Sequence, residues 1–257
     1  MNNVTSTRRG RPPISNRVIR VGGAIALPAI LRGRGIDADA LITQVGLPVA
    51  VFDHPDNVIP FAKLGELTHL AAERTGLSDI GLRACMQTGL VMLGTVGYLV
   101  GNSATVGAGL ASLQSYLHLH DEGAAPYFHR EGSLAVLGYE VLEPDLVGAE
   151  QIVFGALAIA ANLLREICGV GFALLEVNFA YRAPSDTSAF SAHFAAPVRF
   201  DADRSPETSE IQHRIATEAA PPIAEWQGDY AADRHRLTIS ESVGETVVMR
   251  KVGDFCM

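Results

Sequence analysis

The chain has 257 residues, of which 48% are hydrophobic, and a formal net charge of −8. This length can bury a large core, and the acidic balance argues against a general nucleic-acid-coating surface, because phosphate binding needs clustered cations. Three scattered cysteines, Cys85, Cys168 and Cys256, form no disulfide framework and fit a reducing cytosol.

The N-terminal segment, residues 1–20, contains five arginines and no acidic residue. We expect a disordered basic tail that is solvated and not bound to DNA phosphates. The Arg8-Arg9 pair ahead of an apolar run also resembles a twin-arginine export signal. Pro28 interrupts that run and Arg32 follows it, so the interpretation we prefer is a cytoplasmic chain without a membrane segment. An export-directed binding protein is the alternative.

Helices dominate the front half. We expect a short helix over 24–34 and a second that begins after Asp37 as its N-cap. A longer amphipathic helix begins at Pro60, and Gly76 ends it. A shorter helical turn starts at Ser78.

Residues 89–100 are apolar and interrupted by glycines, which approximates a glycine-rich loop but is better explained by helix packing. Ser103 or Thr105 caps the next helix, which runs through Leu117. The segment 125–142 reads as two strands joined at Glu131-Gly132, a β-hairpin.

The stretch 148–169 is the expected centre of the fold. It carries no charge between Glu150 and Arg165, and apolar residues fill nearly its whole circumference. The uncharged run is too short to cross a bilayer, so we expect a buried core helix that Gly169 terminates.

A strand over 173–181 follows, with Leu175, Val177 and Phe179 on one face. A short helix capped by Ser185 and a closing strand over 197–200 complete an α+β domain that extends over residues 21–204.

Residues 205–257 change in character. Acids outnumber bases, and apolar periodicity is nearly absent until LTISESVGETVVMRKV. We expect this divergent tail to be attached to the core and not to form part of it.

The order of these segments resembles the N-terminal, arabinose-binding-like regulatory domain of AraC-type transcriptional regulators. The likeness covers about residues 20–204. The segments that carry it are GIDADALITQVGL, VIPFAKLGELTHLAAERTGLSDIGLR, LGTVGYLVGNSATVGAGLASLQSYLHLHDEGA, GYEVLEPDLVGAEQIVFGALAIAANLLREICG and EVNFAYRAPSDTSAFSAHFAAPVRFDAD.

The resemblance implies a domain that senses a small effector or mediates self-association, ahead of a DNA-binding domain with two helix-turn-helix units. Residues 205–257 contain no pair of amphipathic helices joined by a tight glycine turn. We therefore expect a homodimeric, non-enzymatic sensor that reaches DNA only through a helix-turn-helix domain that this chain lacks. The hypothesis is a truncated or frame-shifted gene product.

Seven polar or aromatic residues are candidates for effector contact. A tyrosine offers a pocket an apolar body with a polar tip, and a polar side chain on a buried helix must find a partner. The candidates are Tyr98, Tyr116, His118, His120, Tyr139, Asn162 and Arg165. For the polar residues of the central helix, a backbone carbonyl is an equally simple partner. We expect no catalytic residue, no metal ligand and no cofactor.

The alternative function is a metal-dependent enzyme that uses the titratable cluster from His118 to Glu122 together with His129. Two histidines at a spacing of two suit shared coordination from a strand, whereas the local pattern is helical. A GxSxG nucleophile motif is absent from the sequence. The interpretation we favour is a histidine pair beside a helix C-terminus.

Overall fold

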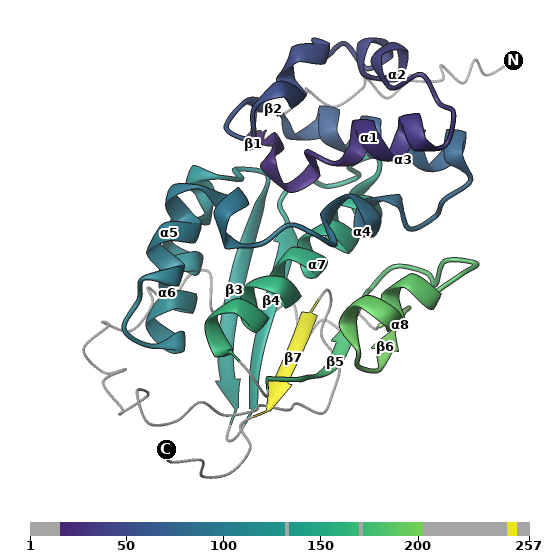
Figure 1. Ribbon diagram of the computed structural model, residues 1–257. Helices are drawn as coiled ribbons and strands as arrows, with labels where there is room; N and C mark the ends of the chain where they lie inside the picture. The colour runs from purple at the N-terminus through teal and green to yellow at the C-terminus, as the bar shows by residue number, and fades with distance from the viewer. Residues whose placement is uncertain (1–15, 132–133, 170–171, 203–245, 251–257) are drawn as a thin grey trace, which may run out of the picture.

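The computed structural model describes residues 16–131, 134–169, 172–202 and 246–250, which form helices packed around a central helix and a mixed sheet (Figure 1). The predicted α+β class is confirmed. The α-helices are α1 (Leu27–Gly33), α2 (Ala38–Gln44), α3 (Phe61–Thr75), α4 (Ile80–Cys85), α5 (Thr95–Gly101), α6 (Val106–Tyr116), α7 (Ala149–Cys168) and α8 (Ser188–Phe194).

Short 3₁₀ helices and strands connect and flank these helices. The 3₁₀ helices are η1 (Val21–Ala24), η2 (Val49–Asp53), η3 (Leu90–Leu93) and η4 (Leu117–Leu119). The strands are β1 (Val18–Arg20), β2 (Val58–Pro60), β3 (Ala124–Glu131), β4 (Leu134–Val141), β5 (Leu174–Asn178), β6 (Val198–Arg199) and β7 (Thr246–Arg250).

Strand β1 lies within the segment that we predicted to be a disordered tail. It pairs antiparallel with β2, and Ile19 also forms a bridge with Asp121. The Arg20 amide donates to the His120 carbonyl oxygen at 2.9 Å. The tail prediction is therefore wrong for residues 18–20, because two partner segments satisfy their backbone groups. Residues 1–15 lie outside the described residues.

Several helix ends are set by the residues that the sequence singles out. The Asp37 carboxylate accepts a hydrogen bond from the Ala40 amide at 3.0 Å, and the Thr105 hydroxyl accepts one from the Ala108 amide at 3.1 Å. Gly76 adopts a φ of 68°, which terminates α3 in the left-handed region.

The predicted cap at Ser185 is wrong. Helix α8 begins at Ser188 with Thr187 at the N-cap, and the Asp186 carboxylate accepts from the Ser188 amide at 2.8 Å. An aspartate two residues before that amide closes the turn in place of the serine hydroxyl.

The large sheet has the strand order β3-β4-β7-β5-β6. The hairpin β3–β4 is confirmed, with Glu131 paired to Leu134, and its turn at 132–133 lies outside the described residues. Strand β7 runs antiparallel to both β4 and β5, whereas β6 is parallel to β5.

Strand β7 corrects the expectation for the C-terminal tail. Residues 246–250 are not attached to the outside of the domain, because they occupy the position between β4 and β5 (Figure 1). The rest of 205–257 lies outside the described residues.

Strand β5 carries an irregularity that alters the predicted face. The pairing register with β7 shifts between Leu174 and Glu176. As a result Leu174 is buried together with Val177 and Phe179, whereas Leu175 is only half-buried. The prediction is correct for Val177 and Phe179 and wrong for Leu175, because a bulge changes which side chains face the core.

Helix α7 is the core element that the sequence predicts. It lies across the large sheet and below the front helices (Figure 1). Val153, Leu157 and Leu164 are completely buried, and the Phe154 ring packs edge-on against Phe190 at 4.9 Å between centroids. The helix is long and apolar enough to cross a membrane, but more than half of its most apolar window is buried inside the fold.

Helix α4 approaches α7 closely enough to require glycine. A Cβ atom on Gly81 would overlap the carbonyl oxygen of Gln151, and one on Gly155 would lie 2.7 Å from the Cys85 sulfur. Because of this contact, α4 and α7 both line the same cavity, next to the hairpin β3–β4.

Candidate functional site

A cavity of about 100 Å³ lies between α7, the hairpin and the front helices. Helix α7 contributes Ile152, Ile159 and Leu163 to its lining. Leu137 of β4 and Leu113 of α6 also line the cavity. The lining is predominantly apolar, so the cavity favours apolar ligand surface.

Two polar side chains of the cavity lie in the segment just after η4. His120 and Asp121 line the cavity together with Tyr139 of β4. The Tyr139 hydroxyl donates to Asp121 Oδ2, and the Gly123 amide donates to Asp121 Oδ1 at 2.8 Å. An aspartate two residues before a glycine closes its own turn in this way.

Burial shifts the pKa values of this polar segment in opposite directions. It raises the pKa of Asp121 to about 6, against the lowering effect of the hydrogen bond from Tyr139 and of the charge on Arg17. Burial, together with the neighbouring Arg20 charge, lowers the pKa of His120 to about 4. Burial also raises the pKa of the Tyr139 hydroxyl. At neutral pH the imidazole is uncharged.

His120 has one buried ring nitrogen with unused bonding capacity. The residue is 6% exposed, and Nδ1 finds no hydrogen-bond partner within the part of the chain that the structure describes. Buried polar atoms in folded proteins are nearly always paired, so an unpaired one beside a cavity is consistent with a partner from outside the chain.

The other polar side chains of the cavity already have partners. The Thr68 hydroxyl donates to the Leu64 carbonyl oxygen at 2.9 Å. The side-chain Oε1 of Gln151 accepts from the Gly81 backbone amide, and its Nε2 donates to the Ser78 carbonyl oxygen, both at 3.0 Å. These groups anchor helices to one another and leave little capacity for a ligand.

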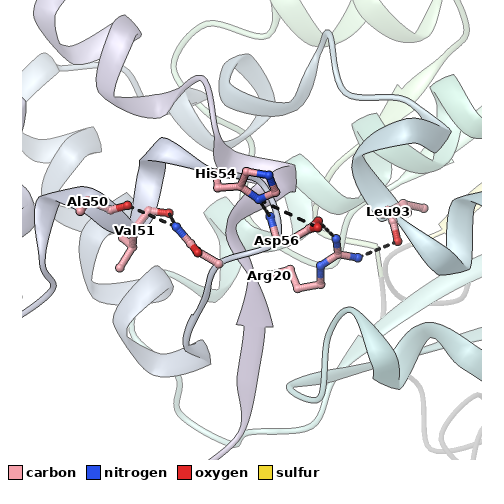
Figure 2. Close-up of polar contacts among 7 residues, drawn as sticks. Arg20, Ala50, Val51, His54, Asp56 and Leu93 are labelled. Atoms are coloured by element: carbon pink, nitrogen blue, oxygen red, sulfur yellow. Dashed lines mark hydrogen bonds and ion pairs between the residues drawn. The ribbon is translucent and has the colours of Figure 1, made fainter.

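Arg20 connects the cavity to the connection before α5. Its guanidinium donates to the Leu93 carbonyl oxygen at 3.1 Å and forms an ion pair with Asp56 (Figure 2). Between η2 and β2, the Asn57 side chain donates to the carbonyl oxygens of Ala50 and Val51. This network fixes η2, β1 and η3 relative to one another.

The seven predicted contact residues separate into three groups. His120 and Tyr139 line the cavity. Tyr98, Tyr116 and His118 are exposed on α5, α6 and η4, and they do not line it.

The third group, Asn162 and Arg165, serves helix packing. Asn162 Nδ2 donates to the carbonyl oxygens of Met86 and Thr88, both at 2.9 Å. Arg165 donates to the carbonyl oxygen of His193 at 2.6 Å. Arg165 also donates to Asn162 Oδ1 at 3.2 Å, the other partners are backbone carbonyls, and neither residue lines the cavity.

Sequence reasoning missed Asp121 and Arg20 as members of this site. Asp121 was noticed only as part of a titratable cluster, although the D-x-G spacing to Gly123 indicates a turn. Arg20 was placed in the tail. Neither position carries a signal in the sequence that it faces a cavity.

The cluster from His118 to Glu122 is divided by the fold. His120 and Asp121 face inward, whereas His118 and Glu122 are exposed, and Glu122 pairs with the Val18 amide at 3.2 Å. Across the described ranges, no three His, Cys, Asp or Glu side chains are placed to hold a metal ion together. His129 lies on β3.

Sequence comparison identifies the family. Residues 35–206 match the model described as the arabinose-binding domain of AraC transcription regulator, N-terminal. The chain belongs to this family. The predicted resemblance is thereby confirmed, and the AraC-type chain contains the regulatory domain of a transcription regulator.

Two relatives of the AraC-type chain carry the same name, the HTH-type transcriptional regulator VirS of Mycobacterium tuberculosis, from strains CDC 1551 / Oshkosh and H37Rv. Each is 24% identical over 189 residues, which cover 73% of this chain and 55% of the relative. The AraC-type chain thus spans about half the length of the curated relatives that it matches.

One solved structure is also similar, that of the transcriptional regulator CdpR from Pseudomonas aeruginosa. Its TM-score is 0.41 at 16% identity, over 52% of this chain and 45% of that chain.

Proposed function

We propose that this AraC-type domain senses a small organic effector and transmits its binding to a partner. The observation that carries the proposal is the apolar cavity with a polar segment at His120, Asp121 and Tyr139. Binding sites for small molecules commonly combine an apolar lining with a few placed polar groups. The cavity lies between the front helices, the hairpin and the central helix.

Helix α6 and the following η4 offer a route from the cavity to the surface. Leu113 and Leu117 line the cavity, whereas Tyr116, beside Leu117 in sequence, is 44% exposed. A change in the position of α6 on ligand binding would therefore move exposed residues. A ligand biases such a movement only by its different affinity for the two positions of the helix.

Self-association is the second part of the proposal. The sequence from Ala84 to His120 contains no Asp, Glu, Lys or Arg. Five large apolar residues in or directly after its helices are exposed, namely Val91 (87%), Tyr98 (69%), Leu119 (53%), Tyr116 (44%) and Leu99 (37%). Interface cores are depleted of charge and enriched in tyrosine.

We call the surface that carries these five exposed residues the charge-free face, and we propose that a second copy of the chain binds to it. Two copies with a net charge of −8 each repel, and a face without charges is where they approach at least electrostatic cost. Tyr98→Glu and Tyr116→Glu should convert a dimer into a monomer in analytical ultracentrifugation. Val58→Glu is the control, because Val58 is 55% exposed on β2 and outside this face. A monomeric parent chain, or a dimer that survives both substitutions, would contradict this part.

We propose that effector binding controls transcription through a helix-turn-helix domain, because the relative VirS is named an HTH-type transcriptional regulator. The effector-dependent change in α6 would be read by a dimer partner or by such a domain.

The test of sensing is a thermal-shift screen with small metabolites, since a ligand that binds only the folded state raises its apparent stability. Ala160 lines the cavity, so Ala160→Leu fills part of it. The parent chain should respond to at least one compound, and the filled variant should not. Ala104→Leu is the control, because Ala104 is exposed and does not line the cavity. A response that Ala160→Leu leaves unchanged would place binding elsewhere.

A further inference from the structure

We propose that the effector is a compact, uncharged molecule with an apolar body and one hydrogen-bonding head group, which His120 Nδ1 recognises beside the Asp121–Tyr139 pair. The inference rests on the proposed sensing function and specifies the chemical class of its ligand. Four features of the cavity lead to it: volume, lining, charge and the unpaired ring nitrogen.

The volume limits the size of the ligand. The cavity measures about 100 Å³, whereas an apolar cavity of about 150 Å³ in another protein accommodates benzene. The part of the ligand that the cavity holds is therefore no larger than a single small ring or a short branched chain.

The lining is unsuitable for a sugar. A sugar carries a hydroxyl on nearly every carbon, and each hydroxyl that loses water without a new partner costs free energy. Among the polar side chains here, Thr68 and Gln151 already bond to the backbone, and Arg20 bonds to Leu93 and Asp56. The remaining capacity is concentrated at His120, Asp121 and Tyr139, enough for one head group.

The charges around the cavity leave no counter-ion for a charged ligand. The Arg20 guanidinium is paired with Asp56, and Asp121 already accepts bonds from Tyr139 and Gly123 while Arg17 lies close enough to lower its pKa. An ionised ligand would lose its hydration without gaining a free opposite charge, which is strongly unfavourable in an apolar lining.

The unpaired ring nitrogen determines where the head group binds. His120 is more than nine-tenths buried, lines the cavity and has a free Nδ1 among the atoms that the structure describes. A neutral imidazole can either accept from or donate to a hydroxyl. The Tyr139 oxygen, which donates its proton to Asp121, retains acceptor capacity for the same head group.

The experiment compares four probes by isothermal titration calorimetry on the full chain: phenol, toluene, benzoate and L-arabinose. Phenol and toluene have nearly the same shape, and only phenol carries a head group. Phenol should bind, and benzoate and arabinose should not. His120→Leu should lower the ratio of phenol affinity to toluene affinity about 3- to 10-fold, the usual worth of one neutral hydrogen bond.

Two controls keep this result interpretable. His118→Leu changes an exposed histidine two residues away and should leave the ratio unchanged. Toluene binding by His120→Leu shows that the cavity is intact in that variant, and Ala160→Leu should abolish the binding of both probes.

The proposed ligand class is overturned if arabinose or benzoate binds while phenol does not, if none of the four probes binds, or if His120→Leu leaves the ratio of affinities unchanged. The sensing function stands in each of those cases if the metabolite screen yields a compound that Ala160→Leu excludes. Without such a compound, the sensing function itself fails.

Discussion

Replacing Asp121 or His120 should reveal two opposing pH dependences of stability that cancel in the parent chain. Both residues are buried at the same end of the cavity, at 2% and 6% exposure. Burial disfavours the charged form of each, which is the anion for the carboxyl and the cation for the imidazole. Their protonation equilibria therefore shift in opposite directions.

The pKa of Asp121 is raised from its usual 3.8 to about 6. Between these values the folded chain binds more protons than the unfolded chain, so stability is complete below about pH 4 and falls as the pH rises to 6. A gap of about two pH units, at about 1.4 kcal/mol per unit, is a loss of about 3 kcal/mol. In Asp121→Asn this loss is removed.

The pKa of His120 is lowered from its usual 6.5 to about 4. Here the unfolded chain binds more protons, so the contribution is complete above pH 6.5 and is lost as the pH falls through 4. The magnitude is again about 3 kcal/mol. In His120→Leu the stability no longer rises with pH in this way, because the substituted chain has no imidazole to protonate.

The assay is urea unfolding at half-unit steps from pH 3.5 to 7, with each variant subtracted from the parent at the same pH. The parent-minus-Asn difference should fall by about 3 kcal/mol across this range and the parent-minus-Leu difference should rise by about as much. His118→Leu, at the exposed histidine, should give a flat difference. Two flat differences for the buried pair would refute the inference that burial sets these protonation states.

Three further substitutions test the packing around the cavity by urea unfolding at neutral pH. Gln151→Leu leaves the Gly81 amide and the Ser78 carbonyl unpaired and should cost about 2–4 kcal/mol. Asn162→Leu should cost about 1–3 kcal/mol and leave phenol affinity unchanged, since its partners are backbone carbonyls away from the cavity. Phe154→Ala removes a ring from the aromatic cluster and should cost about 3–5 kcal/mol. A cost below about 0.5 kcal/mol at any of these positions, typical of exposed sites, would contradict its assigned role.

Local patterns in the sequence predicted the features that local physics decides. Asp37 and Thr105 cap their helices and Gly76 ends one, because each interacts with backbone groups only a few residues away. The apolar circumference of α7 likewise predicted its burial, since a helix of this kind must be covered on several sides.

Long-range pairing was beyond the sequence pattern. Residues 246–250 form a short strand preceded by polar sequence, and their place between β4 and β5 depends on partners roughly 70 to 120 residues away. Strand β1 could not be predicted from the sequence for the same reason, because its backbone partners are β2 and the segment at Asp121. A short strand has little propensity of its own, and its neighbours in the sheet determine whether it forms.

Of the seven contact residues predicted from the sequence, only His120 and Tyr139 line the cavity. Tyr98 and Tyr116 are exposed. The sequence of a helix does not show which of its faces the neighbouring elements cover, so it could not show that these side chains point away from the cavity. Asn162 satisfied the general expectation that a buried polar group has a partner, but the sequence cannot distinguish a carbonyl from an effector. Tyr139 was selected from the sequence because a tyrosine combines an apolar body with a polar tip, and His120 because it belongs to the titratable cluster from His118 to Glu122.

The volume of the cavity sets the free energy that an effector has available for a conformational change. At the rate of about 24 cal/mol per Å³ measured for enclosed cavities, leaving about 100 Å³ unfilled costs at most about 2.4 kcal/mol, because this cavity is partly open to solvent. That cost favours an inward movement of the helix carrying Leu113, and a ligand that fills the space removes it. The amount falls within the usual allosteric coupling of about 1–3 kcal/mol. It follows that Ala160→Leu should act as a partial effector, since it fills part of the cavity permanently and favours the ligand-bound position of α6 without ligand.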